Sequence, residues 1–74
     1  MRMKLHIGDE IRRELRRQER SVSWLAGKLD GVDPSNLNRM LLQKNVKPAL
    51  VFDISIVLKK DLFSLCSQEL SQYL

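Results

Sequence analysis

The chain contains 74 residues, 43% hydrophobic and 30% charged, with a net charge of +4, which fits a single small folded domain. It has one histidine, one cysteine and no glycine-rich phosphate loop, so we expect no enzyme activity, no cofactor and no metal site. Cys66 has no partner for an internal disulfide, and no apolar run approaches the about 20 residues of a membrane span. Without a signal-peptide pattern, we expect a cytoplasmic protein that has no contact with membranes.

Positive charge is concentrated in the first two-thirds of the chain. Residues 1–47 contain eleven Lys or Arg against six Asp or Glu, a balance of +5, whereas residues 48–74 contain two against three, a balance of −1. This asymmetry favours a surface that faces a polyanion, with a merely solvated basic surface as the alternative.

The first two predicted helices are short and amphipathic. Apolar residues four apart, Ile7, Ile11 and Leu15, predict a helix over about residues 8–19. Ser21 is the predicted N-cap of a second helix over residues 22–29. The apolar face of that helix consists of Val22, Leu25, Ala26 and Leu29. Trp24 lies opposite this face on a helical wheel, where it would touch either the DNA backbone or a neighbouring helix.

A third helix is predicted after a break at residues 30–32, where Gly31 suits a left-handed turn. Asp33 is the expected N-cap, and Pro34 occupies the first helical position, where its missing N–H costs nothing. This helix should end near Leu42. Its predicted buried face consists of Leu37, Met40 and Leu41.

Two further helices complete the predicted fold. Pro48 opens a helix over about residues 48–59, whose core side consists of Leu50, Val51, Ile54, Val57 and Leu58. Asp61 can cap a last helix that begins with Leu62, and Cys66 is expected to be buried or half-buried there. The chain is therefore predicted to be a compact all-α domain of four to five helices over residues 1–74, with its core in about residues 7–66.

The second and third helices have the form of a helix-turn-helix, over about residues 21–42, because a short turn containing glycine joins them. Ala26 supplies a small residue where the helices cross, and Leu37 anchors the second of them. Residues 21–29 (SVSWLAGKL), 36–39 (NLNR) and 54–63 (ISIVLKKDLF) resemble the lambda repressor and Cro family of XRE-type regulators. The resemblance covers about residues 7–66. The turn after Leu29 is one residue longer than is usual in that family.

The resemblance implies a lambda-repressor-like five-helix domain that binds specific double-stranded DNA sequences through the major groove and regulates transcription, most simply as a repressor on the nucleoid. On a helical wheel with Leu37 buried, Ser35 and Arg39 point outward, with Asn36 and Asn38 on the two shoulders. The base-reading positions that the resemblance implies fall on Ser35, Asn38 and Arg39. Arginine can bond guanine, and asparagine adenine, through two hydrogen bonds each. The predicted base contacts are Ser35, Asn36, Asn38 and Arg39.

Polar and basic residues around these helices are candidates for phosphate contacts, which position a protein on DNA without specifying the sequence. They are Ser21, Ser23, Gln43, Lys44, Lys47, Arg16 and Arg17, with Arg20 as a further candidate. For the arginines, simple solvation is the alternative.

Regulators of this size usually bind as two-fold dimers, which need a self-complementary apolar patch. Phe52 and Ile56 lie on the flank of the fourth predicted helix. They either close the core against the C-terminal helix or form a homodimer contact together with Leu70, Tyr73 and Leu74. The predicted partners are therefore DNA and a second copy, with no small-molecule ligand. The alternative function is a protein-interaction module, such as an antitoxin or an adaptor, for which DNA binding is secondary.

Overall fold

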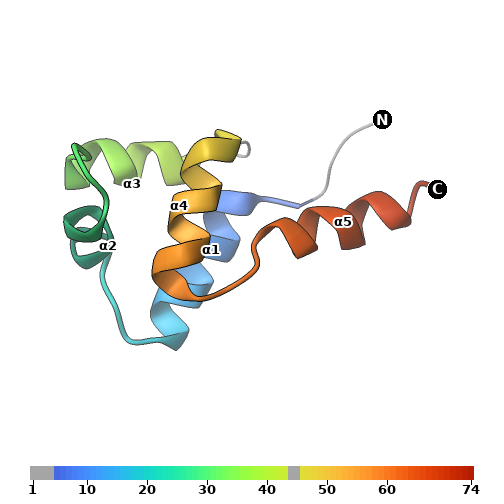
Figure 1. The fold of residues 1–74 in the computed structure, drawn as a ribbon, viewed down its shortest axis with the longest axis horizontal. Coiled ribbons are helices and arrows are strands. Elements are labelled where there is room, and N and C mark those ends of the chain that lie inside the picture. The colour runs from blue at the N-terminus through green and yellow to red at the C-terminus, as the bar shows by residue number, and fades with distance from the viewer. Residues whose placement is uncertain (1–4, 44–45) are drawn as a thin grey trace.

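The computed structural model describes residues 5–43 and 46–74, and these residues form five α-helices and no β-strand. The helices are α1 (Ile7–Arg17), α2 (Val22–Lys28), α3 (Pro34–Leu42), α4 (Pro48–Leu58) and α5 (Phe63–Ser71). Figure 1 shows α1 to α4 gathered together, with α2 and α3 at one end and α5 extending away at the other. Contacts join α3 to both α1 and α2, and α2 to α4. The prediction of an all-α domain is confirmed, and no helix in the described ranges is long and apolar enough to cross a bilayer.

The starts of α2 and α3 are fixed by the side-chain caps that their sequences predict. The Ser21 hydroxyl accepts a hydrogen bond from the Trp24 N–H at 3.0 Å. The Asp33 carboxylate accepts from the N–H groups of Ser35 and Asn36 at 3.0 and 3.3 Å. Because both caps satisfy N–H groups that have no partner within the helix, α2 begins at Val22 and α3 at Pro34, as predicted.

The ends of α1 and α4 depend on charged residues in a left-handed backbone conformation. Glu19 has φ 57° and Lys59 has φ 54°. The left-handed turn at Glu19 returns the chain to the helix, so that the Arg20 N–H donates to the Leu15 carbonyl at 2.8 Å. The prediction that α1 continues to about residue 19 is therefore wrong by two residues. A left-handed helix ending is usually marked in the sequence by a glycine, and here a glutamate occupies that position.

The core is formed by residues of the four helices α1, α2, α3 and α4 together with two residues of the connecting segments. Its buried apolar residues are Ile7, Ile11, Leu15, Leu25, Ala26, Leu29, Leu37, Leu41, Val51, Ile54, Leu58 and Leu62. Three residues predicted as core, Met40, Leu50 and Val57, are only half-buried, because each packs against the core on one side and lines a hollow on the other. The Trp24 ring is half-buried and packs against the core, which agrees with the expected contact to a neighbouring helix. Cys66 is half-buried, as predicted.

Gly8 allows α1 and α3 to pack with their backbones in contact. A Cβ atom at Gly8 would overlap the carbonyl group of Leu41 and lie 3.0 Å from its Cα. Those atoms belong to the backbone of α3 and cannot rotate aside as a side chain can. Gly27 in α2 is the opposite case, because a Cβ atom there would meet nothing within 4 Å.

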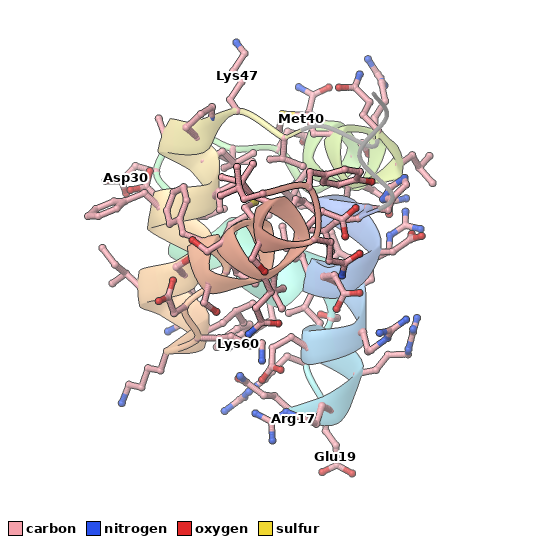
Figure 2. All side chains as sticks on the ribbon, turned by 90° about the vertical axis from the view of Figure 1, so that its right-hand side faces the viewer. Arg17, Glu19, Asp30, Met40, Lys47 and Lys60 are labelled. Atoms are coloured by element: carbon pink, nitrogen blue, oxygen red, sulfur yellow. The ribbon has the colours of Figure 1, made fainter. Side chains whose placement is uncertain are left out.

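A buried carboxylate joins the end of α1 to the end of α4. Glu14 is 5% exposed and accepts hydrogen bonds from Arg17 and, at 2.7 Å, from Gln18, while the Lys60 ammonium lies 3.9 Å away. Gln18 also donates to the Leu58 carbonyl at 2.9 Å. Figure 2 shows Arg17 and Lys60 at the same end of the molecule. The hydrogen bond from Arg17, helped by Gln18 and the two positive charges and opposed by burial, lowers the pKa of Glu14 to about 2.

We expect Gly8→Ala to destabilise the protein although alanine is the better helix former. The added methyl group forces α1 away from α3, and overpacking of this kind costs about 1–3 kcal/mol or more. Gly27→Ala is the matched control and should raise the free energy of unfolding by up to about 1 kcal/mol through helix propensity alone. Urea unfolding measures both, and a stabilised Gly8→Ala protein would contradict the packing described for α1 and α3.

Acid should destabilise the protein partly through Glu14. Its folded pKa of about 2 lies below the ordinary value of 4.5, so its contribution is fully present above about pH 4.5 and is lost as the pH falls towards 2. Glu14→Gln should remove this part of the pH dependence. It should also cost about 1–3 kcal/mol at neutral pH, because an amide N–H2 group would face the donors of Arg17 and Gln18.

The control for this experiment is Glu10→Gln on the same helix, where Glu10 pairs with the exposed Arg13 at 3.2 Å. This variant should keep the acid-dependent loss of stability seen in the parent chain. Thermal melting between pH 2 and pH 7 distinguishes the two variants, and equal acid sensitivity in both would show that Glu14 has no special role.

Candidate nucleic-acid interface

Two adjoining hollows lie where α1, the start of α2 and the start of α3 meet. The first, of about 370 Å³, is lined by Arg12, Leu15, Arg16, Arg20, Val22 and Asn38. The second, of about 310 Å³, is lined by Ser21, Val22, Ser23, Pro34, Ser35 and Asn38. Because Val22 and Asn38 line both, the two hollows form one continuous surface, here called the arginine–serine surface.

Hydrogen-bond donors and positive charge dominate this surface. Arg12 and Arg16 reach it from α1, and Arg20 from the segment before α2. Neither hollow has an aspartate or glutamate among its described lining residues. Since a guanidinium group can only donate and hydroxyl groups can also donate, the surface is suited chemically to the oxygen atoms of a polyanion.

Arg20 is held at this surface by the single tryptophan of the chain. Its guanidinium carbon lies 4.6 Å from the centroid of the Trp24 ring, and the Lys28 ammonium lies 5.8 Å from the same ring. The ring in turn packs against the core, so it provides a fixed support for Arg20. Cation–π contacts of this kind contribute about 0.5–1 kcal/mol at exposed sites and restrict the side chain.

Arg12 connects α1 to the exposed side of α3. Its Nη2 atom donates to the Asn38 side-chain Oδ1 at 3.1 Å and to the Asn38 carbonyl oxygen at 3.4 Å. Sequence reasoning did not select Arg12. Part of the signal was present, because Arg12 and Arg16 are four apart on one flank of α1, directly after the core residues Ile11 and Leu15. Arg20 continues the same spacing beyond the end of the helix.

The four predicted base contacts are exposed side chains on α3. Ser35 and Asn38 belong to the arginine–serine surface. Asn36 and Arg39 line a separate hollow of about 220 Å³, beside the turn that contains Gly31. The structure thus brings the four residues to one helix but divides them between two neighbouring hollows.

The predicted phosphate contacts are more widely distributed. Those that lie on the arginine–serine surface are Ser21, Ser23, Arg16 and Arg20. Arg17 lines neither hollow of this surface. Its Nε and Nη2 atoms donate to Glu14 instead. Figure 2 shows Arg17 at the opposite end of the molecule from Lys47. Lys47 and Gln43 are exposed. Lys44 lies outside the described residues.

Apolar side chains are also exposed on α4 and in the C-terminal segment. Phe52 and Ile56 are 57% and 61% exposed, which decides against the alternative that they close the core. Ile56 borders a hollow of about 300 Å³ that lies between α4 and the turn after α2. On α5 no residue is buried, and Leu70 is exposed, as is Leu74 beyond the helix, while Tyr73 is half-buried. We call this group of residues the α4–α5 flank: Phe52, Ile56, Leu70, Tyr73 and Leu74.

The chain therefore presents two chemically different surfaces. The arginine–serine surface offers donors and positive charge beside the start of α3, and the α4–α5 flank offers uncovered apolar side chains. None of the protein-family models, curated proteins or solved structures compared with the chain matches it.

Proposed function

We propose that the chain is a helix-turn-helix regulator of transcription that binds specific double-stranded DNA sequences with α3 in the major groove. The single observation that carries this proposal is the arginine–serine surface, which places three arginines and two helix starts beside the exposed polar side chains of α3. The major groove is wide enough to admit an α-helix. The resemblance of residues 21–29 and 36–39 to the lambda repressor and Cro family supports the same proposal.

The two groups of residues have different roles in this proposal. Ser35, Asn36, Asn38 and Arg39 contact the edges of the bases, whereas the phosphate contacts come from Ser21, Ser23, Arg16, Arg20, Gln43 and Lys47. Phosphate contacts supply affinity and register, and base contacts supply the sequence preference. Such a protein acts on the nucleoid, where occupation of a promoter leads most simply to repression.

We also propose that the protein binds DNA as a homodimer joined through the α4–α5 flank. Phe52 and Ile56 expose more than half of their surface, and α5 extends from the other helices with no buried residue. A helix of nine residues is marginal by itself in water, so α5 gains stability when its apolar side chains are covered. A second copy provides this cover symmetrically and places two copies of α3 on adjacent half-sites.

The same flank is the observation that favours the alternative function. If a different protein covers Phe52 and Ile56, the chain is an interaction module of the antitoxin or adaptor type, and DNA binding is secondary. The two proposals differ in what the purified chain does alone. A regulator dimerises and selects a DNA sequence without a partner, whereas an interaction module does neither until its partner is added.

DNA binding should depend strongly on salt. About four to eight phosphate contacts would each contribute a slope of about −0.9 to a plot of log K against log salt. Arg16→Met should make the slope less steep by the contribution of about one phosphate contact, and it should weaken binding to all sequences equally. The control is Arg13→Met, since Arg13 on the same helix pairs with Glu10 and lines neither hollow. Fluorescence anisotropy on short duplexes measures both slopes, and an affinity insensitive to salt would contradict groove binding.

Phe52→Glu should yield a folded monomer with weakened operator binding, because a charge at the centre of the proposed contact opposes dimerisation. Sedimentation at several protein concentrations measures the oligomeric state, and thermal melting verifies the fold. The matched control is Leu42→Glu, which also changes an exposed apolar residue, 60% exposed at the end of α3, and should leave the dimer intact. A parent chain that is monomeric at all concentrations, or a Phe52→Glu dimer, would exclude this contact.

A further inference from the structure

Arg12 lies on α1, outside the proposed recognition helix, but its side chain contacts the residue of α3 that lines both hollows. Its Nη2 atom lies 3.1 Å from Asn38 Oδ1 and 3.4 Å from the Asn38 carbonyl oxygen. Arg12 is half-buried, and the contact between Gly8 and Leu41, one helical turn away on both helices, holds α1 close to α3. The position of Arg12 relative to Asn38 is therefore set by the core of the protein.

This contact determines which way the Asn38 amide faces. A guanidinium group has N–H donors and no acceptor, so the amide atom that it meets must be the oxygen. The oxygen and nitrogen of a side-chain amide point in different directions from the same carbon. With its oxygen held by Arg12, the Asn38 N–H2 group is turned away from Arg12.

The orientation matters because the two purines present different edges in the major groove. Adenine offers one acceptor, N7, and one donor, the N6 amino group, so its recognition by asparagine uses both amide atoms. Guanine offers two acceptors, N7 and O6. The Asn38 N–H2 group, turned away from α1, presents N–H donors, which match guanine. The amide oxygen that adenine also requires faces Arg12 and has one of its two acceptor sites occupied there.

We propose that Arg12 is a positioning residue that determines specificity, by orienting Asn38 to select guanine where an unconstrained asparagine would select adenine. This inference rests on the proposed function, since it concerns the base that α3 meets. It replaces the expectation that Asn38 bonds adenine through both amide atoms.

The test is selection of random duplexes on the purified protein and on three variants, Asn38→Ala, Arg12→Met and Arg16→Met. The position read by Asn38 is the one whose preference is lost in Asn38→Ala. At that position the parent chain should favour guanine over adenine on the order of tenfold, and Arg12→Met should shift the preference to adenine. Arg16 lines the same hollow from the next turn of α1 and carries the same charge, so Arg16→Met should weaken binding without changing the preferred base.

Two further variants, Arg12→Lys and a double variant, separate a change in base preference from a change in folding. Arg12→Lys keeps the charge and a donor, and it should retain part of the preference for guanine. When Asn38 is already alanine, adding Arg12→Met should leave the preference at that position unchanged. Circular dichroism verifies that each variant is helical.

Each outcome decides the inference. It is overturned, with the proposed function intact, if the parent chain selects a sequence but favours adenine at the Asn38 position, if Asn38→Ala changes no position, or if Arg12→Met changes only the overall affinity. It is overturned together with the proposed function if the parent chain enriches no sequence at all. A shift from guanine to adenine in Arg12→Met, absent in Arg16→Met, supports it.

Discussion

The backbones of α1 and α3 are in contact where Gly8 faces the carbonyl group of Leu41. On the next turn of α1 the core residue Ile11 is completely buried, and on the corresponding turn of α3 so is Leu37. With the two helices this close, the Arg12 side chain reaches Asn38 on the outer side of α3. A domain of this size has a small core and few contacts to hold any one helix. The position of α3, and therefore of every polar residue on it, depends on the lack of a side chain at Gly8.

The arginines of α1 differ in role because of their neighbours. Arg17 is bonded to Glu14, whose carboxylate also binds Gln18 and lies beside Lys60, so this end of the helix is used to join α1 to α4. Arg12 and Arg16 instead line a hollow beside α3, and the described lining residues of this hollow include no aspartate or glutamate. The same residue type thus pairs with a buried carboxylate on one side of the helix and leaves positive charge available on the other. Net charge alone does not distinguish these two uses.

Periodicity and capping predicted most of the fold, because both are local properties of the chain. Ser21 and Asp33 fix the starts of α2 and α3 through hydrogen bonds to residues two or three positions away. The errors occur where distant residues decide the outcome. Leu50 and Val57 have core-like spacing but are only half-buried, and they line a hollow between α4 and the turn after α2.

For the candidate site, the exposed residues of α3 followed from the helical wheel once Leu37 was placed in the core. The contact of Arg12 with Asn38 did not, because it joins residues 26 positions apart, and the spacing of the arginines shows a basic flank but not which residue of α3 it meets. Gly8 was missed for a related reason. In a helix, glycine usually signals a cost in stability, and only the presence of Leu41 opposite shows that any larger residue would be excluded.

The hydrogen bond between Arg12 and Asn38 also limits what can be transplanted from this protein. A recognition helix is often treated as a portable unit, whose exposed residues can be grafted onto a related scaffold. A graft of α3 would carry Asn38 but leave Arg12 behind, and the amide of Asn38 would be free to turn. Conversely, under the proposed function a single substitution on α1 would give the protein a new target while α3 keeps its sequence. The smallest transferable unit of this domain is therefore the pair of helices α1 and α3, held together by their contact at Gly8.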